Sequence, residues 1–234
     1  MNEHCLFYFS ARCRTSLTKF DITGSFLNQE AFMSDNTTTV SKLAVIATIK
    51  EGIIIGTKNI GPIVVNVLLW ILTIWIPYLN VGTTIGLMVG IVTKASRGET
   101  ISMTEIFDPQ YRKYMGEYFL TAGLVGVGVG AGAIFLIIPG YVIALAWSLA
   151  ILLVIDKGKN PTEAITLSNN LTYGYKGKIF WIQLLSGLML CIVATLLGLI
   201  PEVGILLVCI AAFLYMFVAI GIQASIYKQL TEGV

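Results

Sequence analysis

The stretch FLIIPGYVIAL, residues 135–145, decides the fold because it places Pro139 and Gly140 in the middle of a long apolar region. No charged residue occurs from Tyr118 to Ile155. As one continuous helix this region would be about 57 Å long, whereas the hydrocarbon layer of a bilayer is about 30 Å thick. The region therefore predicts two membrane crossings that are joined by a turn at the Pro-Gly dipeptide.

Two further regions have the same organisation. Residues 59–93 carry no charge, residues 179–227 carry only Glu202, and Pro77 and Pro201 lie near the two centres. Proline disrupts a helix interior but is tolerated where a helix begins, so we expect each region to be a helical hairpin with its turn at the proline. The three prolines follow one another at intervals of 62 residues. This equal spacing indicates a repeated unit.

The predicted fold is an all-α, polytopic integral membrane helical bundle. About six transmembrane helices form three hairpins, and short amphipathic helices lie on the cytoplasmic side. The domain covers residues 41–230 as three helix-plus-hairpin units, at about 41–97, 98–157 and 158–230, with a further helix expected over 41–58. Expected crossings are 60–77, 80–95, 118–138, 141–156, 179–200 and 203–227. Only 12% of residues are charged, about half the usual share in soluble domains.

Residues 1–40 form a polar leader without the apolar segment of a signal peptide. We interpret the leader as disordered, or as lying upstream of a true start at Met33 rather than Met1. The single histidine, His4, lies in this leader, and the cysteines lack the spacing of metal ligands. We therefore predict no catalytic, metal-binding or cofactor-binding residues in the membrane domain.

The distribution of cations predicts the orientation. The turns at 78–80, 139–140 and 201–202 contain no lysine or arginine. All of the cations of the membrane domain lie on the opposite side: Lys42, Lys50, Lys58, Lys94, Arg97, Arg112, Lys113, Lys157, Lys159, Lys176, Lys178 and Lys228. By the positive-inside rule, both termini are expected in the cytoplasm.

Two loops on this side carry helix-start signals. Ser102 and Glu105 have the spacing of a capping box after a helix stop at Gly98. In the next loop, Asn160 precedes Pro161, a pattern typical of an N-cap followed by the first helical residue. We expect each loop to start a short helix along the inner surface.

Basic and aromatic residues precede the third and fifth predicted crossings, in YRKYMGEYF and YGYKGKIFW. Tyrosine favours the headgroup layer, and basic residues there attract anionic lipids. One interpretation is a single contact site for an anionic lipid; the other is ordinary anchoring at the membrane surface. The candidate residues are Arg112, Lys113, Tyr114, Tyr175, Lys176 and Lys178.

Glycines recur at four-residue intervals in the second and third predicted crossings. Small residues at this spacing let helix backbones approach closely. We therefore predict tight helix packing there, with a flexible or gated region as the other interpretation. The glycines are Gly82, Gly86 and Gly90 in one crossing, and Gly126, Gly128, Gly130 and Gly132 in the next.

No charged residue lies at the middle of any predicted crossing, although proton-coupled transporters usually keep one there. Ser148 and Ser186 have no histidine or lysine nearby in sequence to activate them. We expect a non-enzymatic protein, acting as a scaffold, partner or lipid-binding module; the alternative is a small transporter or channel for a neutral or lipidic solute. Expected partners are membrane lipids, other membrane proteins or a second copy, and no nucleic acid, since the net charge is only +2.

The stretch DKGKNPTEAITLSNNLTYGYKGKIF, residues 156–180, carries a resemblance to a known family. Pro161, Glu163, Ala164, Ser168, Leu171 and Gly174, followed by basic residues and a long crossing, resemble a pattern in bacterial six-span membrane proteins. That family includes the membrane domain attached to some glycerophosphodiester phosphodiesterases, and uncharacterised relatives. The resemblance implies a multi-pass protein of the bacterial inner (cytoplasmic) membrane. The phosphodiesterase activity is not expected, because the sequence shows no soluble catalytic domain.

Overall fold

The computed structural model describes residues 43–232, so the predicted polar leader and the choice between Met1 and Met33 lie outside the described residues. The described residues form helices and no strand. Among the described residues, four segments are long and apolar enough to cross a membrane, and one bent pair of helices, Val45–Lys58 with Ile60–Thr73, is a fifth candidate. The four are Met115–Phe135, Ile137–Lys157, Lys176–Gly198 and Gly204–Thr231. The predicted all-α helical membrane bundle is therefore confirmed.

The first unit begins with α3 (Val45–Lys58) and α4 (Ile60–Thr73), which meet at an angle of 68°. The next helix, α5 (Pro77–Ile85), has Pro77 at its first position. The backbone N–H of a first helical residue makes no hydrogen bond within the helix, so the absence of this N–H in proline costs the helix nothing. The turn itself occupies residues 74–76.

The second predicted crossing is an unbroken helical path with a wider turn at its centre. After α5 comes the π-helical segment η1 (Gly86–Gly90), and then α6 (Ile91–Arg97). The path ends at Gly98, whose φ of 70° is left-handed; glycine reaches this conformation without steric cost. Both η1 and α6 are mostly buried, so this segment lies inside the bundle.

The capping box predicted at Ser102 and Glu105 is wrong. Residues 99–104 are irregular, and Glu105 opens a single 3₁₀ turn, η2 (Glu105–Phe107). The next helix, α7 (Pro109–Lys113), starts instead after Asp108, whose carboxylate accepts a hydrogen bond from the backbone N–H of Gln110 at 2.9 Å. Glu105 is not free to cap a helix because its carboxylate is bonded elsewhere in the bundle.

The second hairpin explains why a proline and a glycine interrupt the apolar region. α8 (Met115–Phe135) and α9 (Ile137–Ala146) are joined through Leu136, whose backbone is extended. Pro139 therefore lies in the first turn of α9 and not in the connection itself. A Cβ atom at Gly140 would lie 2.7 Å from the backbone nitrogen of Ala133. The glycine thus permits close contact between α8 and α9.

The fourth predicted crossing is broken after α9, and α10 (Ala150–Lys157) continues it. Helix α11 (Pro161–Thr172) begins at Pro161 as predicted, although the Asn160 side chain makes no capping bond. The Ser168 hydroxyl donates to the Ala146 carbonyl at 2.8 Å and accepts from the backbone N–H of Leu149 at 3.2 Å. Helix α11 therefore satisfies backbone groups that the break would otherwise leave unpaired.

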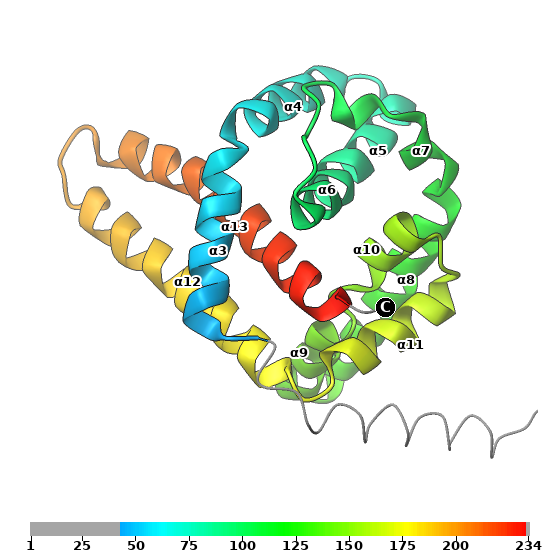
Figure 1. Cartoon of the computed structure of the whole chain (residues 1–234). Coiled ribbons are helices and arrows are strands. Elements are labelled where there is room, and N and C mark those ends of the chain that lie inside the picture. The colour runs from blue at the N-terminus through cyan, green and yellow to red at the C-terminus, as the bar shows by residue number, and fades with distance from the viewer. Residues whose placement is uncertain (1–42, 233–234) are drawn as a thin grey trace, which may run out of the picture. The chain divides into compact units, whose positions relative to one another are not determined.

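The third hairpin consists of α12 (Lys176–Gly198) and α13 (Gly204–Thr231). Pro201 lies in the turn between them, next to Glu202, which has a φ of 69°. Helix α13 packs against α3, α6 and α12, and Figure 1 shows its C-terminal half, in red, enclosed by α3, α6 and α10. Phe217 and Tyr227 of this helix are fully buried. The end of α13 thus forms the centre of the bundle.

Candidate functional site

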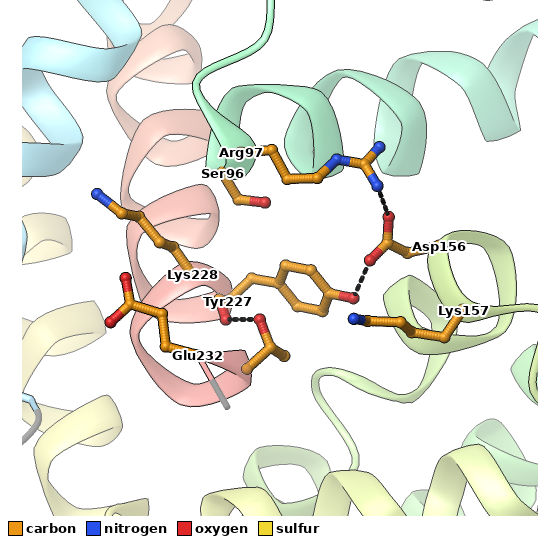
Figure 2. A pocket seen from close by; sticks show the side chains of 8 residues that line it. Ser96, Arg97, Asp156, Lys157, Tyr227, Lys228 and Glu232 are labelled. Carbon is orange, nitrogen blue, oxygen red and sulfur yellow. Dashed lines mark hydrogen bonds and ion pairs between the residues drawn. The ribbon is translucent and has the colours of Figure 1, made fainter. Parts of the chain in front are cut away.

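A polar pocket lies where the C-terminal ends of α6, α10 and α13 meet (Figure 2). We call it the three-helix pocket. Its volume is about 500 Å³, and it is lined by Ser96, Arg97, Asp156, Lys157, Tyr227, Lys228, Thr231 and Glu232. Each of the three predicted units contributes one helix end to it.

Asp156 connects the three helix ends. Its carboxylate accepts hydrogen bonds from Arg97 Nη1 and from the Tyr227 hydroxyl, both at 2.7 Å. The Asp156 side chain is only 4% exposed, and a buried carboxylate is stable only when such partners replace its water. Arg97 also pairs with Glu99 through Nε at 2.9 Å. Asp156 therefore fixes the positions of the Arg97 guanidinium and the Tyr227 hydroxyl at the pocket.

A polar network joins the pocket wall to α3. Lys228 Nζ lies 2.9 Å from the Glu51 carboxylate of α3. Glu51 also accepts hydrogen bonds from the Ser225 hydroxyl at 2.8 Å and from Gln229 Nε2 at 2.9 Å. These bonds hold Lys228 at the edge of the pocket.

A second polar group, the Glu105 cluster, consists of Asn66, Lys94, Glu105 and Tyr111. The Glu105 side chain is 2% exposed, pairs with Lys94 Nζ at 2.9 Å and accepts a hydrogen bond from the Tyr111 hydroxyl at 2.6 Å. Burial raises the pKa of Tyr111, and the hydrogen bond to Glu105 raises this pKa further. A phenol that donates to a buried carboxylate stays protonated.

Asn66 attaches the loop that carries Glu105 to α4. Its Nδ2 donates to the Ser102 carbonyl at 2.8 Å, and its Oδ1 accepts from the backbone N–H of Ile106 at 3.1 Å. Asn66 is fully buried in a helix whose only other polar side chain is Thr73, at its end, so the Asn66 amide needs partners. The sequence reasoning missed Glu105 as a buried residue, although the isolated Asn66 was a signal that a polar segment docks there.

The glycines of the second predicted crossing contact the loop and α7 rather than another crossing helix. Cβ atoms at Gly82 and Gly86 would lie 2.8 Å from Arg112 Cγ and from Ile106 Cα, respectively. Gly90 lies against the Tyr111 ring. The small residues therefore make room for the segment that carries the Glu105 cluster.

The glycines of α8 lie on two different faces. Gly128 contacts the Trp147 ring, and a Cβ atom at Gly132 would lie 2.9 Å from Ile143 Cδ1. Cβ atoms at Gly126 and Gly130 would meet nothing within 4 Å in the described part of the chain. Within the described residues, Gly128 and Gly132 thus take part in packing, and Gly126 and Gly130 do not.

Sequence reasoning missed the closest glycine contact between helices. Gly52 and Gly56 of α3 lie against Gly221 and Phe217 of α13. Gly52 and Gly56 have the same four-residue spacing as the glycines of the second and third predicted crossings. These two residues, however, lie outside the predicted crossings.

The six basic and aromatic candidates form two separate groups. Helix α7 packs against α5 and α8, whereas α12 packs against α13, α3 and α9, and Figure 1 shows α7 well apart from the start of α12. Arg112, Lys113 and Tyr114 belong to the first group, and Tyr175, Lys176 and Lys178 to the second. The structure does not assemble one site from all six residues.

In both groups a lysine lies over the neighbouring tyrosine ring. Lys113 Nζ is 5.3 Å from the Tyr114 ring centre, and Lys178 Nζ is 5.5 Å from that of Tyr175. Neither lysine has a carboxylate partner within residues 43–232. Lys176 instead donates to Asn169 Oδ1 at 3.1 Å.

Comparison of the chain with protein-family models, with curated proteins and with solved structures finds no match. Across the described residues, no group of three or more histidine, cysteine, aspartate or glutamate side chains is arranged to hold a metal ion.

Proposed function

We propose that the protein is a non-enzymatic integral membrane protein that binds anionic phospholipids at its basic and aromatic groups. The proposal includes the bacterial inner membrane as its location and the cytoplasm as the side of both termini. The family resemblance of residues 156–180 and the positive-inside rule support these two points.

The observation that carries the proposal is the contrast between cations that pair with carboxylates and two that lie beside tyrosine rings at the starts of apolar helices. Lys94, Arg97 and Lys228, at the ends of buried helices, all pair with carboxylates of the chain. Lys113 and Lys178, at the starts of the apolar helices α8 and α12, each lie beside a tyrosine ring and have no carboxylate partner among residues 43–232. Cations that a protein leaves without a counter-charge near the headgroup layer favour anionic lipids, by about 1 kcal/mol each.

The hydroxyls inside the apolar helices support a role without catalysis. Ser148 Oγ donates to the Leu145 carbonyl at 2.9 Å, and Ser186 Oγ donates to the Gln183 carbonyl at 3.0 Å. Ser186 also accepts a hydrogen bond from the Tyr215 hydroxyl at 3.1 Å. Their partners are backbone carbonyls and a phenol, and none of these is a base that activates a nucleophile.

A matched pair of double variants tests the proposal. Lys113→Gln with Lys178→Gln removes both cations that lie over tyrosine rings. Lys50→Gln with Lys159→Gln removes the same charge from exposed lysines without such a ring. Native mass spectrometry with added phosphatidylglycerol measures lipid binding. We expect the first variant to bind about fivefold more weakly at each site and the second to match the parent; equal loss in both variants contradicts the proposal.

A further inference from the structure

We propose that the three-helix pocket binds a ligand that carries a phosphate group beside a primary ammonium group, as phosphoethanolamine does. This binding is separate from the anionic-lipid contact, since it uses other residues. The same chemistry occurs in a free solute and in a lipid headgroup, and the experiment below distinguishes the two sources.

The size and position of the pocket suit a small polar ligand. Its volume of about 500 Å³ falls within the usual range of ligand pockets, about 300–1,000 Å³. Figure 2 shows the side chains of Arg97, Lys157, Lys228 and Glu232 around Tyr227. These groups come from the ends of three different helices, so no single helix end accounts for the arrangement.

The cations supply donors for a phosphate. A guanidinium has five N–H donors, and at Arg97 one bond to Asp156 and one to Glu99 fix its plane. The remaining donors of Arg97 are held in place by these two bonds. Lys157 adds an ammonium group to the lining, whereas the ammonium group of Lys228 pairs with Glu51 of α3. Fixed donors of this kind favour phosphate binding because little side-chain entropy is lost.

The anionic groups of the same pocket argue against a bare anion. The lining contains the Glu232 carboxylate and that of Asp156, which is already bonded to Arg97 and Tyr227. Helices α6, α10 and α13 all present their C-terminal ends, which carry partial negative charge. The Glu232 carboxylate and the helix ends disfavour a bare phosphate, and the cations of Arg97 and Lys157 disfavour a bare amine. A ligand with both charges satisfies both sets.

Isothermal titration of the purified full chain in detergent tests this inference. The probes are O-phosphoethanolamine, inorganic phosphate, ethanolamine and dihexanoyl-phosphatidylethanolamine. We expect phosphoethanolamine, free or as the short-chain lipid, to bind at least about tenfold more tightly than phosphate or ethanolamine alone. Binding of both zwitterionic probes identifies a solute site, and binding of the lipid alone identifies a headgroup site. No binding of either zwitterionic probe, or phosphate binding as tightly as phosphoethanolamine, overturns the proposal.

Two variants tie the binding to the pocket. Lys157→Gln should weaken phosphoethanolamine binding by about fivefold or more, while Lys159→Gln, two residues away and outside the lining, should leave it unchanged. Glu232→Gln should weaken phosphoethanolamine binding without weakening phosphate binding. Unchanged binding in both pocket variants overturns the proposal. Neither Lys113 nor Lys178 lines the pocket. A negative result for phosphoethanolamine therefore leaves the proposed phosphatidylglycerol binding unaffected, and a negative result for phosphatidylglycerol leaves the pocket proposal unaffected.

Discussion

At the scale of single residues, several buried polar side chains bond to partners that are distant in sequence. The Asp108–Pro109 start of α7 uses the same local signal as Asn160–Pro161, yet the competing capping-box pattern at Ser102 led the sequence reasoning away from it. Local spacing predicts a cap, but it cannot show that Lys94 and Tyr111 bind the Glu105 carboxylate. The buried position of Glu105 therefore could not be predicted from its neighbours.

The Tyr111 hydroxyl is expected to stabilise the folded protein through its bond to Glu105. Tyr111→Phe removes the 2.6 Å hydrogen bond to Glu105 and leaves a buried carboxylate with fewer donors. We expect a loss of about 1–3 kcal/mol in the free energy of unfolding, measured by thermal or denaturant unfolding in detergent. Tyr173→Phe, at a residue that is 61% exposed, is the control and should change little. Equal losses of unfolding free energy at the two positions would show that the Glu105 cluster does not stabilise the fold.

The pH dependence provides a second measurement on the same variant. Because the pKa of Tyr111 is raised in the folded protein, its contribution to stability is complete below the ordinary tyrosine pKa of about 10. That contribution is lost as the pH rises through the higher folded value, since the unfolded chain releases its proton first. Between pH 9 and about 11, the parent should therefore lose more stability than Tyr111→Phe.

At the scale of the elements, sequence patterns located the helices better than their contacts. The helix stop predicted at Gly98 ends α6, and Gly158 ends α10 in the same way, both with positive φ. The break between α9 and α10 was not predicted, because apolar residues continue through it and the stabilising Ser168 lies on another helix. Four-residue glycine spacing likewise identifies a face that permits close approach, but not the partner of that face.

Two glycines of α8 that are only two residues apart provide a matched test. Gly128→Leu would place a side chain in the space filled by the Trp147 ring, whereas a Cβ atom at position 130 would meet nothing within 4 Å in residues 43–232. Overpacking of this kind typically costs about 1–3 kcal/mol. We therefore expect Gly128→Leu to lower the midpoint of thermal unfolding in detergent and Gly130→Leu to leave it unchanged. The opposite order of the two midpoints would show that α8 packs through its other face.

At the scale of the whole molecule, the positions of the hairpins were the most predictable feature. Pro77 and Pro201 lie at or next to the turns, and Pro139 follows its turn by a few residues. Long uncharged regions with central prolines leave few other arrangements. The first hairpin differs from the others, because α4 has 14 residues and would be about 21 Å long, and because the helical path after it is largely buried.

This difference makes the first hairpin the decisive test of the six-span arrangement. A reporter that is active only outside the cytoplasm, fused after Gly140, should be active, and fused after Gly98 or Gly158 it should be silent, because the cations lie on that side. With six crossings, a fusion after Asn80 should also be active. In that arrangement, local thinning of the bilayer accommodates the short α4. Activity after Gly140 but silence after Asn80 would show that α4 and α5 stay on the inner side as part of the bundle that encloses the Glu105 cluster.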